Sequence, residues 1–99
     1  MEAEKIAEKL RDNLKKYDDF EGLYLYGSHV KEKANKYSDI DIAAIFKKDE
    51  TYNNEILEEA WDLEIENDVI IDFHRVTPAD LEINYIYSNE IKKGIYYAR

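Results

Sequence analysis

Apolar residues recur near the start of the chain at intervals of three and four positions. The stripe consists of Ala3, Ile6, Ala7, Leu10, Leu14 and Tyr17. Glu and Lys fill most of the positions between them, which is typical of an amphipathic helix with one buried side. The pattern predicts a helix from residue 2 to about residue 17, which Asp18, Asp19 and Gly22 bring to an end.

Four short segments have the apolar, aromatic and β-branched composition of strands. They comprise residues 23–26, 39–46, 69–75 and 95–98. The second segment ends in an uninterrupted apolar run, which predicts a strand that is buried on both faces of a sheet.

A further helix is expected over residues 51–66. Its predicted inner side consists of Ile56, Leu57, Ala60, Trp61 and Glu64. On this interpretation Trp61 anchors the helix in the core, and Leu63 lies off the buried side.

The start of the last helix has a physical signature. The Thr77 side chain can cap it, Pro78 suits its first position, and Asp80 lies in its positively polarised first turn. This helix is expected to run to about Tyr87.

Helices and strands thus alternate, with a short helical turn expected in residues 28–36. The order predicts an α/β (α+β) domain, in which helices pack on a small mixed β-sheet. Residues 1–99 are expected to form one domain, because a chain of this length holds a single core.

Composition narrows the possible functions. The net charge of −9 repels a nucleic-acid backbone but favours divalent cations or a basic protein partner. The sequence has no cysteine, which excludes disulfides and thiolate chemistry. Because it shows neither a signal-peptide pattern nor an apolar run of membrane-spanning length, a cytoplasmic protein is expected.

Carboxylates interrupt two of the apolar strand segments. Asp39 and Asp41 lie two positions apart, so they point to the same face of a strand, roughly 7 Å apart at their Cα atoms. Asp72 interrupts the third strand in the same way. If the two strands are neighbours, the three carboxylates converge and can bind Mg²⁺, as two ions. The alternative for Asp39 and Asp41 is an exposed strand end, and for Asp72 an ion pair with Arg75 or a lysine.

Ten residues separate the pair Gly27 and Ser28 from Asp39. Glycine allows a phosphate to approach the backbone closely, and a helix opening at Ser28 would direct N–H groups at the anion. Lys31 and Lys33 could add cationic contacts. The segment is therefore a candidate binding site for a nucleoside triphosphate.

The chain resembles the minimal nucleotidyltransferases of the DNA polymerase β superfamily. The resemblance is carried by a Gly-Ser pair, an Asp-x-Asp motif separated from it by ten residues and a further Asp in a later strand. The resemblance extends over essentially the whole chain. It implies a nucleotidyltransferase fold in which Asp39, Asp41 and Asp72 are catalytic and bind Mg²⁺. It also implies that Gly27 and Ser28 bind ATP or another nucleoside triphosphate. His29 and Glu32 depart from the family pattern, which has Arg and Gly there.

The same resemblance implies an activity and a partner. A nucleoside monophosphate, AMP if the donor is ATP, is transferred to an acceptor hydroxyl, and the partner is a HEPN-type toxin that the chain neutralises as an antitoxin. Two alternatives stay open. One is a non-catalytic antitoxin that acts by steric binding, and the other is a catalytic subunit that modifies a small molecule such as an antibiotic.

Overall fold

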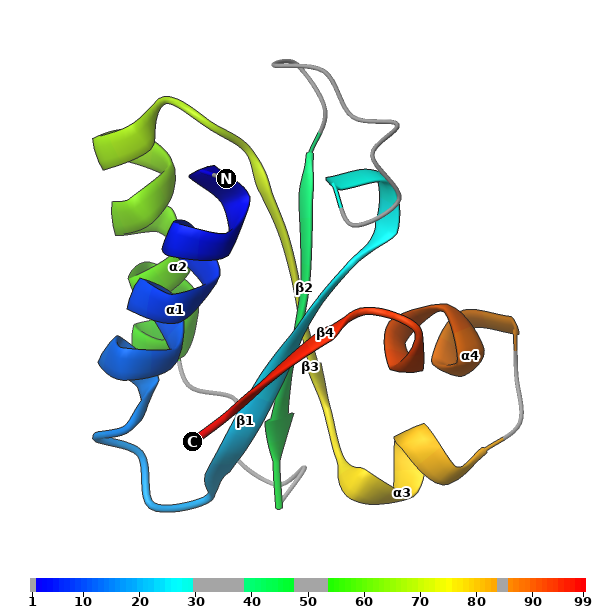
Figure 1. Ribbon diagram of the computed structural model, residues 1–99. Helices are drawn as coiled ribbons and strands as arrows, with labels where there is room; N and C mark the ends of the chain where they lie inside the picture. Colours follow the sequence, from blue (N-terminus) through cyan, green and yellow to red (C-terminus); the bar gives the residue numbers. More distant parts are fainter. Residues whose placement is uncertain (1, 30–38, 48–53, 84–85) are drawn as a thin grey trace.

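A four-stranded mixed sheet forms the centre of the fold (Figure 1). In the computed structural model, which describes residues 2–29, 39–47, 54–83 and 86–99, the strand order is β3-β2-β1-β4. The strands are β1 (Phe20–Tyr26), β2 (Ile40–Phe46), β3 (Ile71–Val76) and β4 (Ile95–Ala98). β1 pairs antiparallel with β2 and β4, whereas β2 and β3 are parallel. The predicted mixed sheet is confirmed.

Helices cover both faces of this sheet. Figure 1 shows α1 (Glu2–Leu14) and α2 (Asn54–Asn67) on one side, and α3 (Pro78–Glu82) and α4 (Ile86–Lys92) on the other. Each side has its own apolar cluster, because alternate strand residues point to opposite faces. None of the helices in the described part of the chain is long and apolar enough to cross a membrane.

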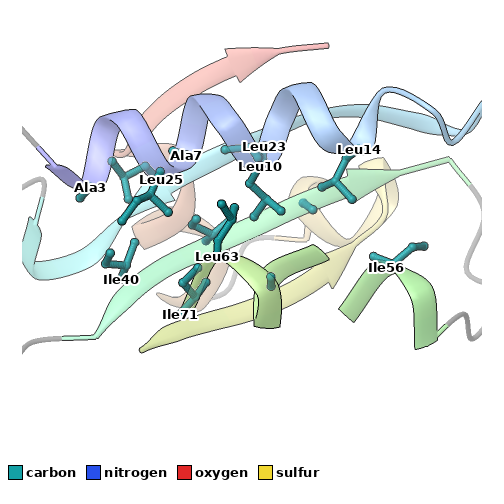
Figure 2. Packing of buried hydrophobic residues seen from close by; sticks show 14 of the residues in the cluster. Ala3, Ala7, Leu10, Leu14, Leu23, Leu25, Ile40, Ile56, Leu63 and Ile71 are labelled. Carbon is teal, nitrogen blue, oxygen red and sulfur yellow. The ribbon is translucent and has the colours of Figure 1, made fainter. Parts of the chain in front are cut away.

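The larger cluster lies between the sheet and the helices α1 and α2 (Figure 2). Ile40 and Ile42 of β2 point into it and are 2% and 0% exposed. The smaller cluster, under α3 and α4, contains Tyr26, Ala43, Ile45, Val76, Leu81 and Ile91. Asp41 has the same parity on β2 as Ala43 and Ile45, so it belongs to this second face.

The first helix is shorter than predicted, because it ends at Leu14. The Tyr17 N–H donates to the Leu14 carbonyl at 3.0 Å, and the Phe20 N–H donates to Tyr17 at 3.1 Å. These turns reverse the chain so that Phe20 can begin β1. Gly22, expected to end the helical pattern, instead lies inside β1 at an irregularity in its pairing with β2.

The predicted inner side of α2 is wrong by a small rotation about the helix axis. Ile56, Ala60 and Leu63 are the buried residues, whereas Trp61 is 51% exposed. Apolar residues occupy more than one stripe of this helix, and the sequence does not say which stripe packs on the sheet. Residues 51–53 of the predicted helix lie outside the described residues.

The cap at Thr77 is confirmed, but the helix that follows ends early. The Thr77 hydroxyl accepts from the Asp80 N–H at 3.2 Å, and the Asp80 carboxylate accepts from the Thr77 N–H at 2.8 Å. Ile83 is extended, with ψ at 127°, so α3 stops at Glu82. A separate helix, α4, begins at Ile86.

Candidate active site

The parallel pairing of β2 with β3 brings two of the predicted carboxylates together. Asp41 is the direct register partner of Asp72, and Tyr26 of β1 is the partner of Asp41 on its other side. Asp72 is exposed and Asp41 is partly buried. Two negative groups therefore lie side by side at the end of the sheet where β2 and β3 begin.

The surroundings of Asp41 disfavour its charge. Burial raises the pKa of the Asp41 carboxyl above its usual range, and the nearby charge of Asp72 and a hydrogen bond with the Asp72 side chain raise this pKa further. The charge of Asp39 acts in the same direction, and His74 partly opposes it. These surroundings therefore favour the protonated form of the Asp41 carboxyl over its charged form.

Asp39 stands apart from this pair. It is exposed and directly precedes β2, two residues before Asp41. Within the described ranges, no group of three or more His, Cys, Asp and Glu side chains is arranged to hold a metal ion. The predicted meeting of three carboxylates is therefore present as a close pair, with the third group near enough to act on Asp41 by its charge.

Gly27 fits against the Asp41 side chain. Its φ of +80° lies in the region that favours glycine, and a Cβ atom there would lie 2.1 Å from Asp41 Oδ2. No other residue type can follow β1 without displacing the carboxylate. The Gly-Ser segment and the second face of β2 are thus in direct contact.

Gly27, Ser28 and His29 form a short 3-10 helix after β1. Ser28 is partly buried beside the glycine. The predicted helical turn is confirmed for these residues. Lys31, Glu32 and Lys33 lie outside the described residues, as does the rest of the segment up to Ser38.

His74 shares a face with Asp72, as strand alternation predicts, although no catalytic role is predicted for it. Its Nε2 lies 3.0 Å from Asp72 Oδ1, and both side chains are nearly half exposed. The expected alternative partner of Asp72, Arg75, instead places its guanidinium 4.6 Å from the centre of the Phe46 ring, on the other face of β3. The position of His74 beside Asp72 follows from the sequence, because residues two apart on a strand share a face.

The sequence profile of the family described as "Polymerase beta, Nucleotidyltransferase" matches residues 8–93. The chain belongs to this family. The predicted family, fold and enzyme class, a nucleotidyltransferase, are thereby confirmed. None of the curated proteins matches the sequence of this nucleotidyltransferase.

Several solved structures resemble the nucleotidyltransferase over nearly its whole length. A toxin–antitoxin complex with AMP-PNP has a TM-score of 0.63 and 24% identity, over 99% of this chain and 72% of that chain. A mutant MntA–HpeT toxin–antitoxin has a TM-score of 0.65 and 22% identity, over 97% and 72%. A tri-AMPylated Shewanella oneidensis HEPN toxin in complex with MNT antitoxin has a TM-score of 0.54 and 25% identity, over 97% and 66%. The first two likenesses concern the fold alone.

Proposed function

We propose that this nucleotidyltransferase transfers AMP from ATP to a hydroxyl group of a HEPN-type partner protein, and so acts as an antitoxin. The observation that carries the proposal is the β2–β3 register, which sets Asp41 beside Asp72 and against Gly27. Family membership supports the reaction type. One similar structure supports the partner, because it is a tri-AMPylated HEPN toxin in complex with MNT antitoxin.

The donor set at this place fits Mg²⁺. Asp41 and Asp72 offer hard oxygen ligands, and a divalent cation would offset the burial and the negative charge of Asp72 that together raise the pKa of Asp41. Mg²⁺ commonly binds through one or two carboxylates and completes its shell with water and substrate phosphates, so a closed cage of three ligands is not required. Asp39 is the third proposed ligand. When bound, the metal neutralises charge on the transferred phosphate.

The reaction assigns one task to each part of the site. The oxygen of the acceptor hydroxyl attacks the α-phosphorus of ATP, and a new P–O bond forms as the bond to pyrophosphate breaks. The hydroxyl proton passes to the Asp72 carboxylate, which His74 orients from 3.0 Å. Pyrophosphate leaves with the electron pair of the broken bond. Gly27 and Ser28 hold the triphosphate, since the backbone at a glycine can approach an anion closely.

A transfer assay tests the proposal. The protein is incubated with ATP labelled at its α-phosphate, Mg²⁺ and a candidate HEPN protein from the same genome. We expect label on the HEPN protein, and its loss in Asp41→Asn and Asp72→Asn, by at least about 100-fold. Asp12→Asn is the matched control, because this exposed aspartate lies on α1, on the opposite face of the sheet.

Toxin neutralisation measured in parallel separates the two antitoxin mechanisms. Neutralisation should fail in the double variant Asp39→Asn, Asp41→Asn if AMP transfer is the mechanism. Full neutralisation by this variant, with no label on the partner in any reaction, would establish steric binding instead.

A further inference from the structure

The outer side of α2 exposes two large apolar side chains one helical turn apart. Trp61 is 51% exposed and Ile65 is 82% exposed. Together with Glu64 and Asp68 they line an open depression on the surface. Ile70, which follows α2 at the start of the β3 edge, is 60% exposed as well. Large apolar side chains gathered in this way commonly mark an interaction site.

The fold does not need these side chains for its core. Ile56, Ala60 and Leu63 already fill the inner side of α2, with exposures of 3% or less. A tryptophan turned outward gives up part of the stabilisation that burial of so large an apolar side chain would provide. Tryptophan is also enriched among the few interface residues that contribute most of the binding energy.

Acidic residues surround this apolar surface. From Asn54 to Asp68 the sequence contains seven Asp and Glu and no Lys or Arg. Glu66 pairs with Lys9 of α1, and Glu59 pairs with Lys16 in the turn after α1, on the flank that faces this helix. Glu58, Asp62 and Asp68 are exposed. The apolar centre therefore has a negative rim that faces solvent.

We propose that Trp61, Ile65 and their acidic rim form a docking surface for a protein that presents an apolar side chain flanked by Lys and Arg. This rests on the proposed function, and the occupant is the HEPN-type partner. Charge complementarity favours such a partner and disfavours a second copy of the chain, because a copy would oppose one acidic rim to another. The net charge of −9 adds to this repulsion.

The position of the docking surface is compatible with AMP transfer. α2 connects β2 to β3, yet it covers the face opposite to Asp41 and Asp72. A partner bound to α2 therefore leaves the carboxylates open. β3 is the outer strand on this side of the sheet order, so the partner can reach Asp72 around that edge, past Ile70. Docking would raise the local concentration of the acceptor hydroxyl.

The chain carries its own probe of this surface, because Trp61 is its single tryptophan. On addition of the HEPN protein from the transfer assay, we expect Trp61 emission to shift to shorter wavelength and to be quenched less by acrylamide. A tryptophan-free variant of the HEPN protein keeps the signal specific. Binding measured by ultracentrifugation without any change in Trp61 emission or quenching would overturn the docking surface and leave the proposed function standing.

Two variants extend the test. Ile65→Ser should weaken binding about tenfold, and the pair Glu58→Lys, Asp62→Lys should weaken it further at low salt, with less difference at high salt. Ile83→Ser is the matched control, since Ile83 is 44% exposed at the end of α3, on the other face. Unchanged affinity in both α2 variants, or an equal loss in the control, contradicts the proposal. Failure of the wild-type chain to bind the HEPN protein overturns both proposals.

Discussion

At the scale of single residues, the site depends on one carboxylate, Asp41, whose charged form is disfavoured by the fold. Asp41 is partly buried and has Asp72 as its register partner. Burial and the Asp72 charge both raise its pKa, so the ionised form costs folding free energy. When the pKa of a group is higher in the folded state than in the unfolded state, the protein becomes less stable as pH rises through the two pKa values.

Asp41→Asn should consequently stabilise the metal-free protein at pH 7. We expect a gain of about 0.5–1 kcal/mol in the free energy of unfolding, kept small because the site is partly solvated. The gain should shrink as pH falls below about 4, where the carboxyl is protonated in both states. Urea denaturation in EDTA across this pH range measures it. Asp12→Asn provides the baseline, and an equal or greater gain at acid pH would contradict the argument.

Gly27→Ala should affect both stability and activity. The new Cβ would meet Asp41 Oδ2, and φ at this position is +80°. We expect a loss of about 1–3 kcal/mol in the free energy of unfolding and a large fall in transfer rate, because the carboxylate must move.

The double variant Gly27→Ala, Asp41→Ala separates the clash from the backbone strain. Removing the Asp41 carboxylate should restore part of the lost stability, and a double-mutant cycle by denaturation gives the coupling. Strict additivity would show that the two residues do not touch.

Much of this residue-scale arrangement follows from the sequence. Strand alternation gives Asp41 and Asp72 a shared face once β2 and β3 are neighbours, and the same rule predicts that His74 shares a face with Asp72. The sequence does not give the short contact between Gly27 and Asp41, because it depends on how the chain leaves β1. The roles of Asp39, Asp41, Asp72, Gly27 and Ser28 stay predictions.

At the scale of elements, the chemical signal at Thr77 located a helix start, whereas periodicity identified the buried side of α1 but not that of α2. The Thr77 cap was predictable because a hydroxyl, a proline and a carboxylate stand at fixed spacing. The buried side of α2 was not, because its apolar residues fit two rotations of the helix, and packing on the sheet chose between them. The end of α1 at Leu14 likewise depends on the turn that starts β1.

The cap offers a prediction for α3. Thr77→Ala removes the hydroxyl that accepts from the Asp80 N–H, so we expect a loss of about 1 kcal/mol in the free energy of unfolding. Thr77→Ser keeps the hydroxyl and should cost much less. Equal losses in the two variants, measured by urea denaturation, would mean that the threonine methyl group matters more than the cap.

At the scale of the whole molecule, a single arginine joins the last strand to the turn between α1 and β1. The Arg99 guanidinium donates to the carbonyls of Lys15, Asp18 and Phe20, at 2.7 to 3.1 Å. Its backbone N–H donates to Glu21 at 3.1 Å. These bonds hold β4 against β1 at the end of the sheet remote from the carboxylates.

Arg99→Ala should therefore lower the free energy of unfolding by about 1–2 kcal/mol, the scale of a few charge-assisted bonds near the surface. Arg99→Lys should recover only part of this loss, because a lysine ammonium lacks the planar, branched donor groups with which the guanidinium reaches three carbonyls. Thermal denaturation of the three proteins checks the order. A lysine variant as stable as wild type would argue for a simple charge effect.

The overall architecture was the most predictable level, because alternating helical and strand patterns limit a short chain to few layered arrangements. The strand order β3-β2-β1-β4 could not be predicted from the sequence, because periodicity does not indicate which strands pair.

The parallel match of Asp41 with Asp72 constrains how such a chain can change in length. Insertions or deletions in the connection that contains α2 alter the route between the two strands without altering their pairing. One residue added inside β2, ahead of Asp41, would turn that carboxylate toward the apolar layer beneath α1. Asp41 and Asp72 would then no longer form a pair. The spacing within β2 is therefore fixed by the acidic pair, whereas the connection that contains α2 can change in length without moving it.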